Sequence, residues 1–453
     1  MSLTKVTYRM TDGDYTNVVD FGADSTGTND SSSAIQAAVD SVTSGVIYFP
    51  KGTYKILSTV NVDLSSKPYI TFIGVGSGSK LLWDLSSNGP IINFKKGSNS
   101  AYATLENLRI ENNYRTGDTT LNNVVGLRIG EKDAAATSGV NGTCNVTVNK
   151  CQFLYCETHI EIFSESDQIS VNDCYFFVWT GYAVLSTANP LVVSGASNSS
   201  VRVLNNHFLG GQNGSVAIRT KGSACYVIGN VIQNATSGKG IEIDGGQGFN
   251  ISTNYTESAG VGPFIYCIDS DSGYIGENEI GGYAGGSVIH ITADTDNVNI
   301  GANYYAVSGG FPTNHILIDS GATGVNILGK QQATSGSSNL ISGSPNLFVD
   351  GAGKLQSSIV NSSNGYVNIA GASSETIFTS ASTQTYIVTA TQGSENYAET
   401  AIVTVPEGAT TAVVTSLYQT NANLAISASG LAIQVDNGIG STRTVTFSYL
   451  RIS

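Results

Sequence analysis

Carboxylate side chains that alternate with buried isoleucines are the residues of this chain best suited to chemistry. Glu242 and Asp244 occupy polar positions of one alternating strand, and Asp269 and Asp271 follow the equivalent strand one repeat later. Hydrolysis of a glycosidic bond needs two carboxyl groups, about 5–5.5 Å apart for retention and about 6.5–9.5 Å apart for inversion. We expect these four residues to form a catalytic patch on the outer surface. Asp269 and Asp271 have a competing interpretation as turn residues, and Glu242 as part of an ordinary solvated strand face.

Further carboxylates are candidates elsewhere in the repeat. Glu257 is a catalytic candidate in the string Asn-Tyr-Thr-Glu, and Glu279 occupies the equivalent slot of the next repeat, so the two could form a pair. Glu257 is predicted on a different face from Glu242, which could place it too far away to pair with that residue. Glu161 is a third candidate, on an outward position of the strand over residues 159–163.

Aromatic, basic and imidazole side chains near these carboxylates are candidates for binding sugar. Sugar rings stack on aromatic rings through their C–H faces, and cations bind acidic groups. A core or loop-anchor role competes for the tryptophan, and a subunit interface would also explain the tyrosines. The predicted binding residues are Trp179, Tyr182, Arg219, Tyr226, Tyr255, Tyr266 and His290.

A fixed sequence period must position these residues. Asn206, Asn230, Asn254, Asn278 and Asn303 recur with steps of 24, 24, 24 and 25 residues. Such a period, combined with short alternating strands, predicts an all-β parallel β-helix in which each rung stacks on the next at about 4.7–4.9 Å. The asparagine column is expected to satisfy backbone groups at a bend and to tolerate left-handed backbone angles.

The period continues less regularly upstream of Asn206. Asn149 and Asn172 continue the pattern with a step of 23 residues. The following step of 34 predicts an inserted loop of about ten residues, placed within Gly181 to Ser200.

Composition narrows the function further. The net charge of −13 argues against a nucleic-acid partner, whose binders need a basic face. No apolar run approaches the length of a membrane span, so we expect no membrane insertion, and no signal-peptide pattern opens the chain. The cysteines show no metal-ligand spacing and are expected to be small core residues; they are Cys144, Cys151, Cys156, Cys174, Cys225 and Cys267.

One helix is predicted near the N-terminus, as a cap over the open end of the solenoid. Residues 31–43 have apolar residues at helical spacing after a possible N-cap at Asp30 or Ser31. This helix lies within the string NVVDFGADSTGTNDSSSAIQAAVDS, which is followed by GVIYFPKGTYKI. These strings resemble the opening of the pectate-lyase-like right-handed parallel β-helix family, in the branch found in bacteriophage tailspikes. The preceding VTYRM is similar to the segment that joins a tailspike's virion-anchoring part to its β-helix.

The organisation expected from period, texture and resemblance has five parts. Residues 1–16 form an N-terminal stub, 17–98 the start of the β-helix with its cap, and 99–335 the β-helix that carries the site. Residues 336–365 form a linker, and 366–453 a C-terminal antiparallel β-sandwich of six to eight strands, because long alternating runs replace the period there. The resemblance implies that such a C-terminal domain holds three chains together or binds sugar.

The resemblance also implies a function. Tailspikes bind, and usually cut, capsule or O-antigen polysaccharide at the bacterial surface. A homotrimer, made in the host cytoplasm, is expected to join the virion tail through its N-terminus and to act outside the cell. Endo-glycosidic hydrolysis without a cofactor is the main hypothesis. The alternatives are a non-catalytic adhesin, a polysaccharide lyase that uses a cation such as Ca²⁺ on Asp269 and Asp271 or on Asp294 and Asp296 with Arg219 as base, and a deacetylase through His290.

Overall fold

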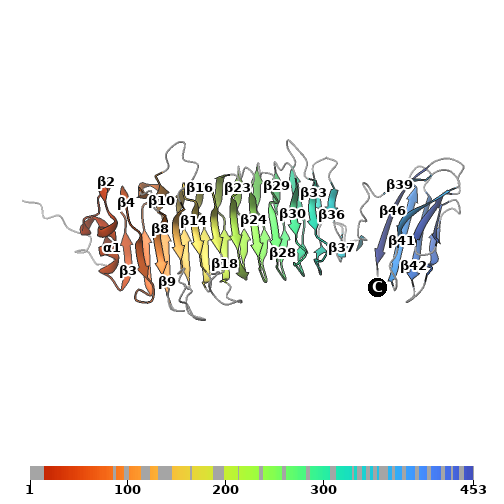
Figure 1. Ribbon diagram of the computed structural model, residues 1–453, viewed down its shortest axis with the longest axis horizontal. Helices are drawn as coiled ribbons and strands as arrows, with labels where there is room; N and C mark the ends of the chain where they lie inside the picture. Colours follow the sequence, from red (N-terminus) through yellow and green to blue (C-terminus); the bar gives the residue numbers. More distant parts are fainter. Residues whose placement is uncertain are drawn as a thin grey trace, which may run out of the picture.

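Three long sheets of mostly parallel strands form the body of the protein (Figure 1). The computed structural model describes the chain except for residues 1–14, 85–87, 96–100, 114–122, 131–144, 164–165, 187–197, 213, 234–237, 258–261, 282–285, 307–312, 329–330, 334–338, 343–346, 350–354, 357–365, 370–372, 380–383, 393–396, 406–409, 420–423, 430–431, 438–442 and 452–453. Cys144, most of the predicted N-terminal stub and most of the predicted linker lie outside the described residues. In the part of the chain that is described, no helix is long and apolar enough to cross a membrane.

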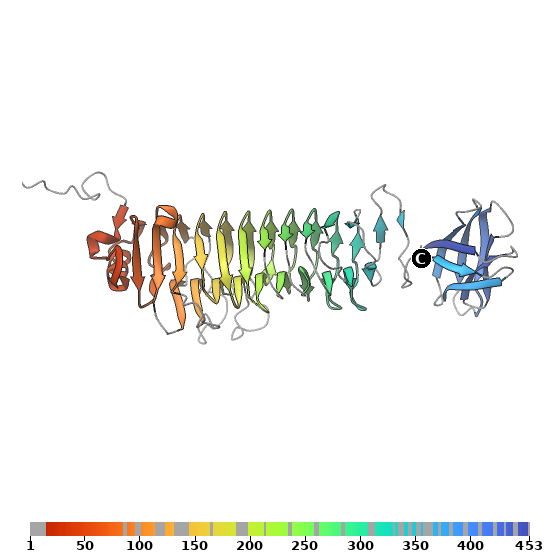
Figure 2. The same cartoon turned by 90° about the horizontal axis from the view of Figure 1, so that it is seen from above.

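Each rung contributes one strand to each sheet, and successive rungs pair in parallel (Figure 2). Sheet A consists of β1 (Tyr15–Asn17), β3 (Ser44–Tyr48), β6 (Tyr69–Ile73), β9 (Tyr102–Glu106), β12 (Val146–Asn149), β15 (Asp167–Asn172), β18 (Asn198–Leu204), β21 (Gly222–Ser223), β22 (Tyr226–Ile228), β25 (Asn250–Ser252), β28 (Tyr274–Gly276), β31 (Asn299–Ile300), β34 (Asn326–Ile327), β37 (Leu347–Val349) and the antiparallel β38 (Leu355–Gln356). Sheet B consists of β2 (Thr26–Asp30), β4 (Gly52–Ile56), β7 (Ser79–Trp83), β10 (Arg109–Asn112), β13 (Gln152–Leu154), β16 (Tyr175–Trp179), β19 (His207–Gly211), β23 (Val231–Gln233), β26 (Tyr255–Glu257), β29 (Glu279–Gly281), β32 (Asn303–Ala306) and β35 (Gln331–Ala333). Sheet C consists of β5 (Val60–Asp63), β8 (Gly89–Lys95), β11 (Val124–Ile129), β14 (Thr158–Ile162), β17 (Tyr182–Ser186), β20 (Val216–Thr220), β24 (Lys239–Asp244), β27 (Ile265–Ile268), β30 (Ser287–Ile291), β33 (Asn314–Ile318) and β36 (Asn339–Ser342).

The core lies between the three sheets and is built from stacked columns. Alternation along each strand sends one set of side chains inward, and parallel pairing in register places equivalent residues above one another. On sheet B, for example, Phe153, Phe176 and Phe208 stack with ring centroids 5.4 and 4.6 Å apart and are fully buried. The predicted all-β parallel β-helix is confirmed.

The asparagine column runs along the bend between sheets A and B. Asn254 Oδ1 accepts the Asn230 backbone N–H and its Nδ2 group, both at 3.0 Å. Asn254 Nδ2 in turn donates to Val227 O at 2.9 Å and to Asn278 Oδ1 at 3.0 Å. The same pattern joins Asn206, Asn278 and Asn303, all buried, so the column satisfies the backbone at the bend as predicted.

Two details of this prediction are wrong. The left-handed backbone angle belongs to the residue before the asparagine, for example Thr253 at φ +54° and Glu277 at φ +60°. Upstream, Asn172 pairs with Leu204 rather than with Asn206, so Asn149 and Asn172 stand on strands of sheet A and outside the column. The column position is taken there by Cys151 and Cys174.

The cysteines of the column copy the hydrogen bonds of the asparagines. Cys174 Sγ donates to Val148 O at 3.7 Å and accepts the Cys151 backbone N–H at 3.4 Å. Cys151, Cys156, Cys174, Cys225 and Cys267 are all buried and free, which confirms the prediction of core cysteines for the described ones.

The predicted helical cap is present as α1 (Ser32–Asp40), which is shorter than expected. Ser31 is the N-cap residue and makes no side-chain capping bond, whereas Oδ1 of the preceding Asp30 accepts the Ser32 N–H at 2.9 Å. Ile35, Ala38 and Val39 are fully buried against the first rung. Two short 3₁₀ helices, η2 (Val18–Phe21) and η3 (Gly76–Gly78), lie nearby in the sequence.

The C-terminal part contains two antiparallel sheets, which confirms the predicted sandwich. One sheet has the order β39 (Tyr366–Ile369), β46 (Arg443–Arg451), β41 (Gln384–Gln392), β42 (Tyr397–Val405) and β43 (Val413–Gln419). The other has the order β40 (Ser373–Thr379), β45 (Ala432–Asn437) and β44 (Leu424–Ser429). The stretch predicted as an inserted loop, Gly181 to Ser200, holds strand β17 and the first residues of β18, with residues 187–197 outside the described part.

Candidate functional site

The outer face of sheet C carries a column to which each rung contributes one residue. Register pairs place Leu185 beside Arg219, Arg219 beside Glu242, Glu242 beside Tyr266, and Tyr266 beside His290. Neighbours in such a column are separated by about 4.8 Å. Four of the predicted site residues therefore occupy consecutive rungs.

Arg219 joins the two predicted carboxylates of β24. Its Nε lies 3.0 Å from Glu242 Oε1, and its Nη2 lies 2.5 Å from Asp244 Oδ2. Tyr182, one rung before, accepts a hydrogen bond from Arg219 Nη1 at 3.2 Å. Although burial alone would lower it, the pKa of Arg219 is raised above its ordinary value by the hydrogen bonds to Asp244 and Tyr182 and by the charge of Glu242.

Two lysines complete the ion-pair network around these carboxylates. Lys239 Nζ lies 2.5 Å from Glu242 Oε2 and 4.0 Å from the centroid of the Tyr266 ring. Lys221 Nζ lies 3.4 Å from Asp244 Oδ1. The Glu242 side chain is only 5% exposed, against 14% for Asp244, so Asp244 is the more accessible carboxylate.

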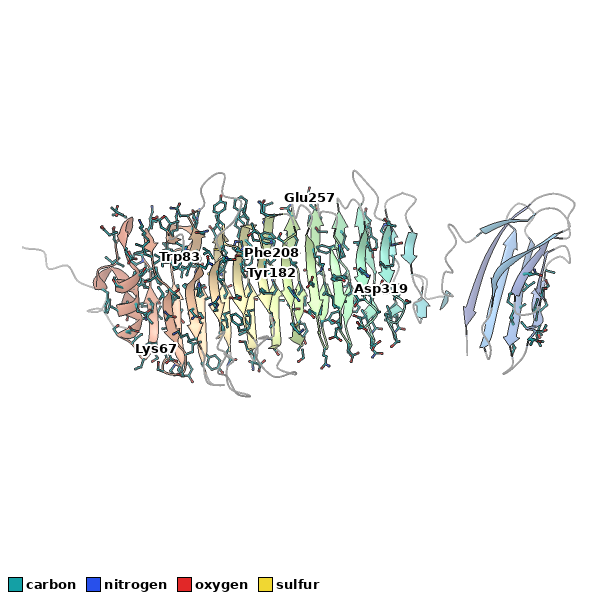
Figure 3. All side chains as sticks on the ribbon, viewed as in Figure 1. Lys67, Trp83, Tyr182, Phe208, Glu257 and Asp319 are labelled. Carbon is teal, nitrogen blue, oxygen red and sulfur yellow. The ribbon has the colours of Figure 1, made fainter. Side chains whose placement is uncertain are left out.

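A histidine–aspartate pair follows on the next rungs. His290 Nε2 lies 3.0 Å from Asp319 Oδ1, and the His290 ring lies 5.0 Å from that of Tyr266. We call the residues joined by these contacts the sheet C cluster: Tyr182, Arg219, Lys221, Lys239, Glu242, Asp244, Tyr266, His290 and Asp319. Tyr182 and Asp319 are labelled in Figure 3.

Glu161 lies in the same outer column, three rungs before Glu242. Its Oε2 is 2.8 Å from Arg128 Nε on the preceding rung. Burial, together with the charge of Glu161, raises the pKa of the nearby Glu157. At about 4.8 Å per rung, Glu161 is about 14 Å from Glu242, too far to act with it on one bond.

Asp269 and Asp271 lie at the turn that follows β27, outside the sheet C cluster. Asp269 is exposed and has the left-handed φ of +45°. Asp271 accepts hydrogen bonds from Asn297 Nδ2 at 2.9 Å and from Ser272 Oγ at 3.0 Å, which lower its pKa. These contacts match the competing interpretation as turn residues.

Three other predicted residues are on different sheets. Tyr255 and Glu257 are on β26 of sheet B, where Glu257 accepts a hydrogen bond from Gln233 at 2.6 Å. Figure 3 shows Glu257 at the upper edge of the solenoid. The register pairs Glu279 with Tyr255, so Glu257 and Glu279 are offset along their strands. Tyr226 is on β22 of sheet A, beside Arg202 and Asn250.

Trp179 is fully buried at the end of β16, so the prediction that it stacks on sugar is wrong. Its ring makes edge contacts with His159 at 6.0 Å and with Phe208 at 6.4 Å. No face of the indole is available to a ligand. The alternative interpretation, a core residue, is the one that the structure supports.

Lys221, Lys239 and Asp319 were missed by the sequence prediction. Lys221 and Asp319 directly follow their strands, where alternation no longer indicates a direction. A usable signal existed for Asp319, because Ile316 and Ile318 align with the inward isoleucines of the preceding rungs. Among the described residues, no group of three or more His, Cys, Asp or Glu side chains is arranged to hold a metal ion.

Comparison with known proteins identifies a family model that matches the start of the β-helix. Residues 15–82 match the family model described as Rhamnogalacturonase A/epimerase, pectate lyase-like. No curated protein matches the chain. The expected resemblance to the pectate-lyase-like parallel β-helix proteins is confirmed.

Solved structures agree on this fold. The DFA-IIIase of Arthrobacter chlorophenolicus A6 has 14% identity and a TM-score of 0.53, and the match covers 73% of this chain and 87% of that one. Its complex with GF2 gives the same identity and TM-score. ORF18 of Geobacillus virus E2 has 16% identity, and the match covers 96% of this chain and 76% of that one with a TM-score of 0.47.

Proposed function

We propose that the protein is a phage tailspike that binds capsule or O-antigen polysaccharide along sheet C and hydrolyses it internally. The observation that carries the proposal is the pair Glu242 and Asp244, two outward carboxylates on one strand joined by Arg219. The N-terminal strings that resemble tailspikes support the phage assignment. The matched family model, named after a rhamnogalacturonase and an epimerase, supports an activity on polysaccharide.

The two carboxylates of β24 take different roles in the proposed reaction. Arg219, Lys221 and Lys239 surround the two carboxylates with positive charge. A carboxylate suits the base that activates water, and the more accessible Asp244 takes that role. Glu242 then holds Arg219 and Lys239 in place.

The proton for the leaving oxygen must come from another group, and we assign it to His290. Histidine commonly serves as a general acid, and Asp319 orients the His290 ring. His290 lies two rungs from Glu242, and Asp244 is two residues further along β24, so the Cα atoms of the proposed acid and base are about 12 Å apart. Tyr266 lies on the rung between them and is placed to stack on the sugar ring.

The test compares Asp244→Asn, Glu242→Gln and His290→Asn with a matched control, Glu111→Gln. Glu111 also pairs with an arginine and a lysine and its side chain is 14% exposed like that of Asp244, but it lies on sheet B. Reducing ends are measured on the polysaccharide of a strain that the parent protein clears in a spot test. Asp244→Asn and His290→Asn, which remove the proposed base and acid, should each lose at least about 100-fold in turnover, with the control within a few-fold. Glu242→Gln should also lower turnover, because it releases Arg219 and Lys239. Turnover within a few-fold of the parent in folded Asp244→Asn would overturn the proposed base.

A polysaccharide lyase is the second candidate, because a lyase needs a basic residue that abstracts a proton. Arg219, Lys221 and Lys239 all lie in the sheet C cluster, although this region of the chain contains few cations. Only a lyase acting on a uronic-acid polymer would form an unsaturated product that absorbs ultraviolet light together with the reducing ends. Cell binding without reducing ends would instead identify an adhesin. Attachment to the virion through the N-terminus and assembly as a homotrimer belong to the same proposal, and light scattering of the intact protein tests the trimer.

A further inference from the structure

The outer face of sheet B differs in chemistry from that of sheet C. Between β13 and β32 the outward positions carry rings and aliphatic side chains together with Gln152, Gln233, Glu257 and Glu279, and the strands of this stretch contain no lysine or arginine. Register pairs place Tyr175 beside His207 on the next rung and, further along, Glu279 between Tyr255 and Tyr304. We call the outward residues Tyr155, Tyr175, Phe177, His207, Tyr255 and Tyr304 the sheet B platform.

Four of the platform rings, those of Tyr155, Tyr175, Phe177 and His207, contact one another on the outside of the sheet. Tyr175 and Phe177, two residues apart on β16, are nearly parallel at 12° with centroids 6.1 Å apart. Tyr155 meets Phe177 edge-on at 5.5 Å, and His207 meets Tyr175 edge-on at 5.3 Å. The core on the inner side of the same strands is already filled by Phe153, Phe176 and Phe208, so the platform does not serve that core. All six residues are partly exposed.

A line of polar groups runs beside the rings. His207 Nε2 lies 2.7 Å from Gln233 Oε1, and Gln233 Nε2 donates to Glu257 Oε2 at 2.6 Å. Rings that accept C–H faces, next to amide and carboxylate groups that bond hydroxyls, match the two kinds of surface on a sugar. The buried centre of a protein–protein contact is instead depleted of charged residues such as Glu257.

The negative charge of the sheet B face favours uncharged sugars over anionic ones. Glu257 and Glu279 flank Tyr255, and burial followed by these two charges raises the pKa of its phenol. Because no cation is present on the strands, an anionic polymer would be repelled here, whereas sheet C offers Arg219, Lys221 and Lys239.

We propose that the sheet B platform is a second carbohydrate-binding surface, which takes a chain of uncharged sugars and is separate from the sheet C cluster. It goes beyond the proposed function and rests on it only in that the protein acts on polysaccharide.

The experiment is affinity electrophoresis of the full chain in native gels that contain dextran, mannan or galactan, with alginate as the anionic comparison. The platform variants are the double change Tyr175→Ala with Phe177→Ala and the single change Tyr255→Ala. Tyr255 lies on a distant rung, so this variant still tests the proposal if the double variant does not fold. Tyr69→Ala is the matched control, because Tyr69 is an exposed tyrosine, stacked on Tyr102, on sheet A.

We expect at least one neutral polysaccharide, and not alginate, to retard the parent. The platform variants should weaken that binding at least tenfold and the control less than twofold. No retardation by any of the three neutral polymers, or equal retardation of parent and variants, would overturn the proposal. A change of oligomeric mass in the variants with unchanged retardation would overturn it as well, because the face would then join copies of the chain. If the protein releases reducing ends but is not retarded, the proposed hydrolysis stands and the platform proposal fails. If it is retarded by a neutral polysaccharide but releases no reducing ends, the hydrolysis proposal fails and the platform proposal stands.

Discussion

Replacing Asn254 with alanine should destabilise the middle of the β-helix by at least about 4 kcal/mol. The side chain makes four buried hydrogen bonds: it accepts two from Asn230 and donates one each to Val227 O and Asn278 Oδ1. Alanine leaves the Asn230 backbone N–H without that acceptor, which costs about 1–3 kcal/mol when the group is buried. Each of the other three bonds contributes about 1 kcal/mol, because their partner groups keep further contacts.

Amide hydrogen exchange is the direct assay for this prediction. A loss of about 4 kcal/mol corresponds to roughly a thousandfold faster exchange at Asn230, since about 1.4 kcal/mol is tenfold. Asn250→Ala is the control, because Asn250 lies on β25 of the same rung and outside the asparagine column. Asn254→Cys should lose less than the alanine variant, since Cys174 makes equivalent bonds at the same position of the column. Exchange within threefold of the parent in Asn254→Ala would refute the reasoning.

The remaining predictions concern single positions. Burial lowers the pKa of His159 to about 3, so below its ordinary value of 6.5 the unfolded chain takes up a proton that the folded protein refuses. Stability should therefore fall by up to about 1.4 kcal/mol per pH unit from pH 6.5 towards 3, and His159→Phe should reduce that slope in denaturant titrations; an unchanged slope would contradict it. Gly238→Ala should destabilise by about 1–3 kcal/mol or more and reduce hydrolysis, because its new Cβ would meet Ser215 O at 1.5 Å next to Lys239, and an unshifted unfolding midpoint would exclude this clash. Trp179→Ala should cost about 3–5 kcal/mol, while Trp179→Phe should keep polysaccharide affinity within about twofold, and a large loss of affinity in the folded variant would restore a binding role.

The repeat made most of the fold predictable. A step of 24 residues predicts which strands stack, and the register confirms that Glu242, Tyr266 and His290 lie on one face. The upstream asparagines were assigned wrongly because a thiol can take the place of the amide. The column position holds Cys174, whereas Asn172 stands two residues earlier, so a search for a repeating asparagine selects the wrong residue.

The site was less predictable because its details depend on bends. Alternation assigns a side to a residue only within a strand, so it failed at Lys221, Asp319 and Trp179, which lie at or beyond strand ends. Trp179 turns inward at the end of β16, where it packs against His159. Asp269 shows the opposite case, since its left-handed angle is the turn property that its residue type already indicated.

The separation of inner and outer columns has a consequence for how this chain can change over generations. The hydrogen bonds of Asn230, Asn254 and Asn278 involve no outward side chain, and neither do the stacked phenylalanines. Exchanging an outward residue therefore changes the outer surface of a rung, while the hydrogen bonds and ring stacking that stabilise the rung stay the same. Proteins of this architecture can therefore keep the fold while their outward residues change, and the fold is shared with a protein at 14% identity.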